Sequence, residues 1–566
     1  MPDKKSSPPV DREKRARKRE SERETSPSSN VRRATNSKRT AKRQTRSLRA
    51  GLAVIGGRAA GAISRRLHLG GGTSIAGVVA QRIYPDIVNH LSSQLAYGSV
   101  LVTGTNGKTT TSGFIAAILS DAGLRVWRNR EGSNLMRGIA GALVIRARPG
   151  GNLRRAGQAI SIFEVDEAVV PHIIEAVPLR VAVFTNLFRD QLDRYGEVDS
   201  VSTRWQRAVN ALPTSATMIL NADDPAVARL AESRPDNVVY FGIDDATLDL
   251  AAQGTSAERH QTIDTRACAK CGAELVYSMR FYSHLGHYHC PNCGSTRPQP
   301  DVRATSVTMN AFDQLRIAVE TPTQQGEIVI PLPGLYNIYN ALAAVAAAQA
   351  LQINWEPIVS GIQQFKPAFG RGERVQVAGR TIRILLAKNP TGFNEVLRTL
   401  FSEGEKRHVL LMLNDNIADG RDISWIWDVD FERIAQQTTT LTVTGTRALD
   451  LGLRLKYAGI DTQAMSIVPL TPIRAAGGKE ISVSRIQASE NDRAQSNGKL
   501  TEARKLRPAT KVAQTYGLAY ALDHALQETP VGETLFVIPT YTGLLDIHRE
   551  LERRGLTPHY WEEKGP

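Results

Sequence analysis

The chain has four cysteines, and their spacing is that of metal ligands. Cys268 and Cys271 form one Cys-x-x-Cys pair, and Cys290 and Cys293 form a second pair after eighteen intervening residues. Tetrahedral zinc needs four converging sulfurs, and each pair supplies two of them from one turn. Because four thiolates leave no open coordination position, we predict a structural zinc ribbon at 265–296.

Two other uses of these cysteines are less favoured. Disulfides do not suit the reducing compartment expected for this chain. One of His284, His287 and His289 could replace a thiolate, since all three lie inside the loop. If all four cysteines bind zinc, none of them is available as a catalytic nucleophile.

A second stretch, "TGTNGKTT" at Thr103–Thr110, has the composition of a phosphate-binding loop. Between a short apolar run and a helical pattern, such a loop aims backbone N–H groups at phosphate. Lys108 is expected to reach the β- and γ-phosphates, and Thr109 to hold Mg²⁺. The common pattern has a glycine where this chain has Val102, so the loop is a shortened form. The expected ATP-binding residues here are Gly104, Thr105, Asn106, Gly107, Lys108, Thr109 and Thr110.

A third stretch, "LNDNIADGRDISWIWD" at Leu413–Asp428, groups four aspartates beside Trp425 and Trp427. Grouped aspartates bind a metal, cap helices, or act on a group supplied from elsewhere. Asp422 precedes Ile423-Ser424 and could simply cap the helix that carries the tryptophans. Asp415, Asp419 and Asp428 are expected to shape the loop.

The elements that must position these residues alternate between strand and helix patterns. Apolar runs such as "AISIFEVDE", "RVAVFTN" and "ATMILNADD" are separated by helical stretches, which predicts an α/β fold with a mainly parallel sheet. Residues 51–97 predict one or two helices. A second alternating set predicts a smaller α/β domain over 376–566, in which the polar stretch 470–510 is expected to be a disordered insert.

The net charge of +15 is concentrated at one end of the chain. Residues 1–50 hold 17 Lys+Arg and 6 Asp+Glu, a net +11, so the other 516 residues carry only +4. We expect this tail to be disordered, because it has almost no apolar residues to bury. Attraction to an anionic membrane is a second possibility, and nucleic-acid contact a third. Without a run of 18 apolar residues, the protein is expected to be cytoplasmic.

Beyond the loop glycines, the chain resembles the Mur ligases from about 98 to 375, within a domain expected over 51–375. The resemblance is carried by Glu164 in "FEVDEA", by "TNLFRDQLDRYGE" (185–197), by "NADDP" (221–225), by "GLYNIYNALAA" (334–344), and by Gly370 and Arg371. It implies that Asn337, Asn340 and Arg371 contact ATP, and that Glu164 binds magnesium together with Thr109.

The departures from this family concern the incoming amino acid. Gln191 stands where the family has a metal-binding histidine, and no lysine lies between Gly196 and Leu220. In "LLAKNP", Leu385 and Lys388 replace the family's aspartate and histidine. The usual amino-acid-binding third domain is not visible. Activation of a carboxylate by ATP is therefore expected to be retained, and capture of an amino acid to be lost.

Together with the four cysteines and the aspartate stretch, these features resemble one branch, the MurT family of lipid II isoglutaminyl synthase subunits. The resemblance implies that ATP phosphorylates the α-carboxyl of D-glutamate in the lipid II stem peptide, and that ammonia then gives D-isoglutamine. It implies a separate glutaminase, a GatD-like class I glutamine amidotransferase, at the inner face of the membrane. Asp422 is then expected to orient the histidine of that subunit.

Two other functions are open on sequence alone. A self-sufficient Mur-type ligase, similar to folylpolyglutamate synthase, would need the missing lysine and third domain. A nucleic-acid-binding ATPase would use the zinc ribbon and the basic tail, but the near-neutral body makes a specific nucleic-acid partner unexpected.

Overall fold

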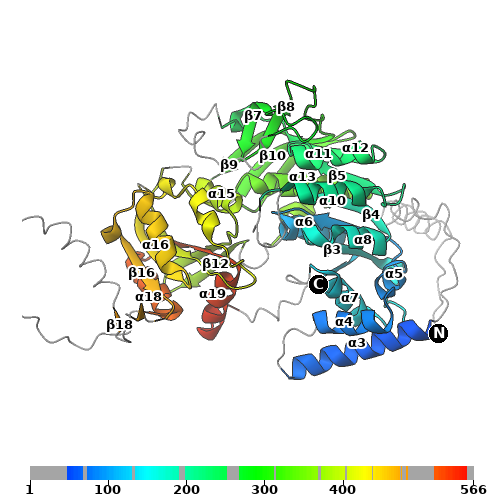
Figure 1. The fold of residues 1–566 in the computed structure, drawn as a ribbon, viewed down its shortest axis with the longest axis horizontal. Coiled ribbons are helices and arrows are strands. Elements are labelled where there is room, and N and C mark those ends of the chain that lie inside the picture. Colours follow the sequence, from blue (N-terminus) through cyan, green and yellow to red (C-terminus); the bar gives the residue numbers. More distant parts are fainter. Residues whose placement is uncertain are drawn as a thin grey trace, which may run out of the picture.

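The computed structural model describes twelve segments of the chain, which build two α/β units side by side (Figure 1). The described residues are 47–67, 73–129, 134–189, 198–250, 267–310, 314–366, 371–401, 404–435, 437–471, 473–474, 480–481 and 516–557. Most of the basic tail and most of the 470–510 insert lie outside them.

Among the described residues three helices precede the first sheet, one more than the upper bound predicted from the sequence. They are α3 (Leu48–Arg66), α4 (Thr73–Ile83) and α5 (Ile87–Ser92). Pro85 separates α4 from α5, because proline cannot donate the backbone hydrogen bond that would continue the helix. The inner residues of α3, including Ala50, Ala53 and Val54, are fully buried in the core that covers one face of the first sheet.

The first sheet has nine strands in the order β11-β10-β9-β6-β5-β4-β1-β3-β2. Seven neighbouring strands run parallel, namely β9, β6, β5, β4, β1, β3 and β2. Strands β10 and β11 form an antiparallel edge beside β9. Their bounds are β1 (Ser99–Thr103), β2 (Arg125–Arg128), β3 (Ala159–Glu164), β4 (Leu179–Phe184), β5 (Thr217–Asn221), β6 (Val238–Ile243), β9 (Val302–Asn310), β10 (Gln314–Glu320) and β11 (Gln325–Ile330).

Both faces of this sheet are covered by helices, as the continuous apolar runs of its central strands require. Val100 and Val102 of β1 belong to one core, and Leu101 belongs to the other, following the two-residue period of a strand. The first core is covered by α6 (Lys108–Asp121), α13 (Tyr336–Ala350) and α14 (Trp355–Gln363). On the second face lie α7 (Met136–Arg146), α8 (Val170–Ala176), α10 (Val198–Val209), α11 (Pro225–Ala228) and α12 (Leu230–Ser233).

A small hairpin interrupts this unit between β6 and β9. It consists of β7 (Val276–Tyr282) and β8 (Leu285–His289), which pair antiparallel. Phe281, Tyr282 and Leu285 at its turn are buried in the core that contains Val100 and Val102 of β1. The hairpin that carries the cysteines is therefore anchored in the first unit by its apolar turn.

The second sheet has six strands in the order β12-β13-β19-β14-β15-β16. Only the β12–β13 pair is antiparallel. The bounds are β12 (Arg371–Val377), β13 (Arg380–Leu385), β14 (Arg407–Met412), β15 (Thr438–Gly445), β16 (Met465–Pro469) and β19 (Thr534–Pro539). A separate two-stranded ladder joins β17 (Ile473–Arg474) to β18 (Glu480–Ile481).

Helices again cover both faces of the second sheet. One core lies under α15 (Pro390–Leu400) and α16 (Ala448–Tyr457), and the other lies under α18 (Leu518–Glu528) and α19 (Tyr541–Arg553). In Figure 1, α15 lies on the side of this unit that faces the first one. The expected fold class, a P-loop α/β domain with a smaller α/β domain after it, is confirmed.

Candidate active site

The phosphate loop follows β1 at the position where the strand order reverses. Strands β3 and β2 lie on one side of β1, and β4 to β6 lie on the other. In open α/β sheets, ligands bind at the carboxyl ends of the strands at such a reversal. The loop depends on two glycines, Gly104 (φ +136°) and Gly107 (φ +84°). Residues with a side chain rarely adopt these backbone conformations, because the Cβ atom makes them strained.

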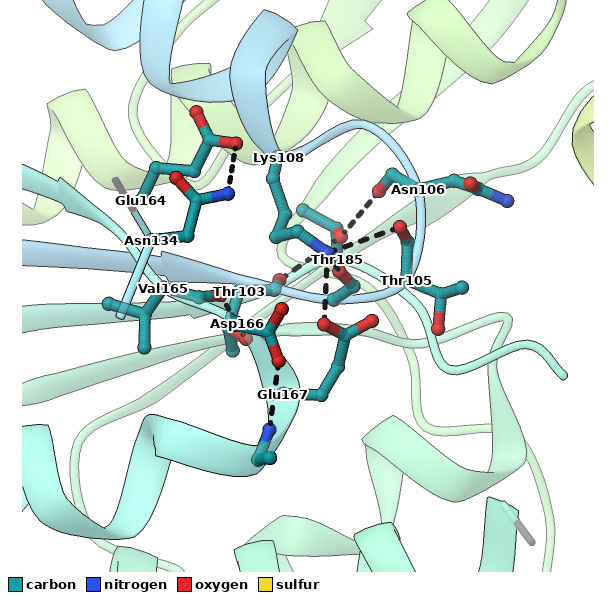
Figure 2. Close-up of polar contacts among 12 residues, drawn as sticks. Thr103, Thr105, Asn106, Lys108, Asn134, Glu164, Val165, Asp166, Glu167 and Thr185 are labelled. Carbon is teal, nitrogen blue, oxygen red and sulfur yellow. Dashed lines mark hydrogen bonds and ion pairs between the residues drawn. The ribbon is translucent and has the colours of Figure 1, made fainter. Parts of the chain in front are cut away.

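Beside the loop, Thr109 and Glu164 lie in direct contact, although they come from different elements. The Thr109 hydroxyl donates to Glu164 Oε1 at 2.8 Å. Asn134 Nδ2 donates to the same oxygen at 3.1 Å, as Figure 2 shows. Thr109 is the second residue of α6, and Glu164 ends β3. Mg²⁺ prefers oxygen ligands and is usually held by one or two carboxylates together with substrate phosphates, and this donor set fits that preference.

Lys108, at the first position of α6, is buried together with an acidic partner. Its ammonium lies 3.0 Å from Glu167 Oε2 and also donates to the carbonyls of Gly104 and Thr105 (Figure 2). Trp205 Nε1 donates to the Glu167 carbonyl at 2.9 Å and so helps to fix this turn. Glu167 was not among the predicted site residues. Its place three residues after Glu164 in "FEVDEA" was the available signal.

An asparagine network joins the phosphate loop to the second unit. The Asn106 backbone N–H donates to Asn186 Oδ1 at 2.8 Å, and Asn389 Nδ2 donates to Asn106 Oδ1 at 3.1 Å. Asn389 also caps α15, since its Oδ1 accepts from the Gly392 N–H at 2.8 Å. Neither Asn186 nor Asn389 was predicted as a site residue, although both lie in the motifs quoted for the Mur resemblance.

A cleft between the two units lies next to this loop, with about 760 Å³ of space that includes open solvent. Five residues predicted to bind ATP line it: Asn106, Gly107, Thr110, Asn337 and Asn340. From the other elements come Tyr282 of the hairpin and Leu385, Leu386, Thr391 and Glu395 of the second unit.

Asn340 connects the cleft to the phosphate loop. A Cβ at Gly107 would lie 2.0 Å from Asn340 Oδ1, which also accepts from Thr111 Oγ1 at 3.2 Å. Asn340 Nδ2 donates to Asn337 Oδ1 at 2.9 Å. The Arg371 side chain, Gly370 and Gln191 lie outside the described residues, so their predicted roles remain predictions.

Glu395 is a buried carboxylate on the second-unit side of the cleft. Burial raises its pKa, and the nearby Arg398 guanidinium, which donates at 2.6 Å, opposes this effect. Arg398 in turn donates to the Phe281 carbonyl of the hairpin at 2.7 Å. The cleft is therefore walled by three parts of the chain that are far apart in sequence.

The four cysteines converge at the outer end of the hairpin. One sulfur from each lies within 4.8 Å of every other, with Cys268–Cys293 at 3.6 Å and Cys271–Cys290 at 3.4 Å. These separations are far above a disulfide bond and close to the roughly 3.8 Å edge of a tetrahedron with 2.3 Å metal–sulfur bonds. The Ala273 N–H, then Asn292 and Cys290, lower the pKa of Cys271 to about 6, which favours the thiolate. The residues fit a four-thiolate metal site.

None of the three loop histidines is placed among these sulfurs. His284 is fully buried with Nε2 3.3 Å from Asp224, and His287 Nε2 lies 2.8 Å from the Ile243 carbonyl. His289 ends β8. In the described part of the chain, the only group of metal-ligating side chains with this convergence is the cysteine quartet.

Three of the four aspartates in 413–428 have structural partners within the protein. Asp415 pairs with Arg447 at 3.1 Å, and buried Asp419 accepts from the Thr542 N–H at 2.7 Å. Asp428 pairs with Arg189 of the first unit. These contacts shape the loop and attach it to its neighbours, as the sequence predicted.

Asp422 differs, because it is exposed and bonds only to Ser424 among the described residues. Its Oδ1 accepts from the Ser424 N–H at 2.8 Å. This bond lowers the pKa of Asp422, so the carboxylate is charged at neutral pH. This bond reaches the first residue of a short 3-10 segment, Ser424–Asp428, whose N-cap residue is Ile423, and no α-helix starts there as the capping role implied. Support of this turn and presentation to a partner are thus both compatible with the position of Asp422.

Comparisons with known proteins agree with this architecture. The family model "Mur ligase middle domain" matches residues 102–293, and "MurT ligase C-terminal" matches 386–494. The lipid II isoglutaminyl synthase (glutamine-hydrolyzing) subunit MurT of Staphylococcus aureus (strain COL) is 35% identical over 72% of this chain and 87% of its own length. The chain belongs to the MurT family.

A second MurT relative, from Streptococcus pneumoniae (strain ATCC BAA-255 / R6), is 32% identical over 74% of this chain and 89% of its own length. Among solved structures, a pseudomurein peptide ligase type C from Methanothermus fervidus is similar with a TM-score of 0.54 and 23% identity, over 81% of this chain and 78% of that one. Membership of the MurT family sets aside the nucleic-acid-binding ATPase and the self-sufficient ligase. No described helix is long and apolar enough to cross a membrane.

Proposed function

We propose that this chain is the synthetase subunit of a glutamine-dependent lipid II isoglutaminyl synthase. It phosphorylates the α-carboxyl of D-glutamate in the stem peptide and directs ammonia to the resulting acyl phosphate. The observation that carries the proposal is the contact of Thr109 with Glu164 beside the phosphate loop, next to the cleft lined by both units. The names of the MurT relatives support the choice of acceptor.

In this proposal each group at the loop has one task. A carboxylate has no usable leaving group, so its oxygen must first receive the γ-phosphoryl group of ATP. Lys108 stabilises the negative charge on the transferring group. Thr109 and Glu164 would hold Mg²⁺, which would neutralise charge on the phosphate oxygens. Asn337 and Asn340 line the part of the cleft that takes the nucleoside.

The nitrogen must come from another polypeptide. Hydrolysis of glutamine by the usual route needs a cysteine thiolate activated by histidine. The chain has only four cysteines, and all four lie in the metal-ligating group. We therefore infer a partner of the GatD-like, class I glutamine amidotransferase type, in which Asp422 orients the catalytic histidine across the interface.

An exposed apolar surface that includes Trp427, five residues after Asp422 in the sequence, supports this partner. Trp427 is 52% exposed and its ring lies 5.7 Å from that of Tyr457, which is 71% exposed. Leu449 and Leu453 precede Tyr457 at four-residue spacing on α16, so the three side chains share one helix face. Exposed aromatic residues are common anchors of protein interfaces.

We propose that the cysteine quartet holds a structural Zn²⁺. Supporting this, the hairpin turn carries Tyr282 into the cleft, so the metal would stabilise one wall of the nucleotide site. Elemental analysis of the purified protein should give about one zinc per chain. A folded protein without zinc would contradict the assignment.

The proposed acceptor is lipid-linked, so we place the reaction at the inner face of the membrane. The test of the whole proposal separates the two nitrogen sources. The purified chain with ATP, Mg²⁺ and the lipid-linked acceptor should form D-isoglutamine from ammonium but not from glutamine. Adding the amidotransferase subunit should make glutamine a donor. Amidation from glutamine by the isolated chain would refute the division between two subunits.

A further inference from the structure

The outward face of α3 carries a row of exposed apolar side chains that the proposed reaction does not use. Leu48 is 87% exposed, Leu52 61%, Ile55 52% and Ile63 58%. Together with exposed Ala59 they follow the three- and four-residue spacing of one helix face. We call this row the α3 stripe. Soluble proteins seldom leave such a continuous apolar row in water without a partner.

The inner face of α3 is fixed closely against the rest of the first unit, so the stripe cannot turn inward. A Cβ at Gly57 would lie 2.6 Å from the Ala76 carbonyl of α4. At Gly51 it would lie 2.9 Å from the Pro149 carbonyl. The helix lies at the outer edge of the molecule, with α4 and α7 on its inner side (Figure 1). The stripe is thus a rigid, outward surface about 23 Å long, at about 1.5 Å per residue.

The charge around the stripe is of one sign. Exposed Arg49 and Arg65 lie on opposite flanks of the stripe at helical spacing, and Arg66 follows at its end. From Thr25 to Pro85 the sequence contains twelve Lys or Arg and neither Asp nor Glu. An apolar helix face flanked by arginines, continuous with a basic segment, is the arrangement that binds in the plane of an anionic bilayer.

We propose that the α3 stripe docks the chain on the anionic membrane surface. The apolar side chains enter the boundary between headgroups and acyl chains, while the flanking arginines contact lipid phosphates. This deepens the proposed function, because it names the surface that brings the cleft to a lipid-linked acceptor. The docking itself needs neither nucleotide nor glutamine. It can therefore fail or succeed independently of amidation.

The test uses the full-length protein in flotation with two kinds of vesicle. One kind contains phosphatidylcholine alone, and the other is a mixture with phosphatidylglycerol. We expect binding to the mixed vesicles that weakens with added salt, and little binding to the neutral ones. Replacing Leu52, Ile55 and Ile63 by Glu should lower the partition coefficient at least about tenfold. The matched control, Val276→Glu with Met309→Glu and Val531→Glu, changes three other exposed side chains and should bind like the wild type.

A second measurement needs no variant. Hydrogen exchange of the wild-type chain should slow in the α3 segment when mixed vesicles are added. Equal vesicle binding by the wild type and the triple-Glu variant would assign the attraction to the basic tail and overturn the proposal. So would protection of α3 by the amidotransferase subunit or by self-association instead of by lipid.

Discussion

The phosphate loop and the aspartate loop at 413–428 are built in opposite ways. At the phosphate loop, Lys108, Thr109 and Glu164 are all buried, and each bonds to another residue of the site. In the aspartate loop, Asp422 is exposed and bonds only to its own turn among the described residues. The first region can bind a small ligand with the groups that it already holds. The second region offers the negative charge of Asp422, which contacts no catalytic side chain among the described residues.

This difference indicates where each site is completed. A site for phosphate gains from exclusion of water, because its electrostatic contacts strengthen in a low dielectric. A group that acts on another protein must stay exposed until that protein covers it. Trp427, which follows Asp422 by five residues, and Tyr457, which contacts Trp427, are both exposed and are consistent with such a cover. A substitution of Asp422 should therefore affect only the reaction with glutamine, whereas a substitution in the phosphate loop should affect the reactions with both nitrogen sources.

The largest effect is expected from Asp422→Asn in the assembled complex. Asparagine keeps the capping bond to Ser424 but removes the charge that orients a histidine. Glutamine hydrolysis should fall by about 10⁴-fold, whereas ammonium-dependent amidation should persist. Asp461→Asn is the matched control, because exposed Asp461 caps its turn in the same way, with Gln463 N–H at 2.9 Å. Normal glutamine hydrolysis by an assembled Asp422 variant would exclude the interface role.

Lys108→Met should affect the other region and therefore both nitrogen sources. Removing the cation that faces the transferring phosphoryl group should reduce amidation by roughly 10³-fold, measured with ammonium and with glutamine. Lys406→Met, at an exposed position near β14, should leave both rates unchanged. If only the glutamine reaction fell, the phosphate loop would not be the synthetase centre.

Trp427→Ala should weaken assembly of the complex without altering chemistry in the isolated chain. Loss of an aromatic anchor costs about 2 kcal/mol, so the dissociation constant for the amidotransferase should rise about 30-fold. Titration calorimetry measures this directly. Tyr520→Ala removes a less exposed ring on α18 and serves as the control. Equal affinity of both variants would place the interface elsewhere.

The smallest effect is expected at the ion pair that joins the aspartate loop to the first unit. Arg189 and Asp428 pair across the two units, but their side chains are 33% and 40% exposed. A double-mutant cycle with Arg189→Ala and Asp428→Ala should therefore give a coupling free energy of only about 0.2–1 kcal/mol. A coupling of several kcal/mol would show that this pair holds the units together.

Local patterns predicted much of this molecule because they arise from neighbouring residues. Gly104 and Gly107 in a strand–loop–helix setting predicted the phosphate loop, and the Cys-x-x-Cys pairs predicted a metal-ligating group. The N-terminal region was less predictable. Its described residues form three helices, whereas the sequence pattern predicted one or two. Glu167, Asn389 and Tyr282 were missed because their importance comes from partners distant in sequence.

The sequence by itself determined the kinds of chemistry available to this protein: phosphate binding, thiolate metal binding, and a lack of any cysteine to spare. These follow from residue identity and short spacing, which the backbone converts directly into geometry. Only the tertiary structure decided which groups meet and which stay exposed. Folding brought Thr109 to Glu164 and buried both, but left Asp422 and the α3 stripe in solvent. Apolar runs indicate which strands are buried, but the burial of these polar groups depends on the packing of whole layers.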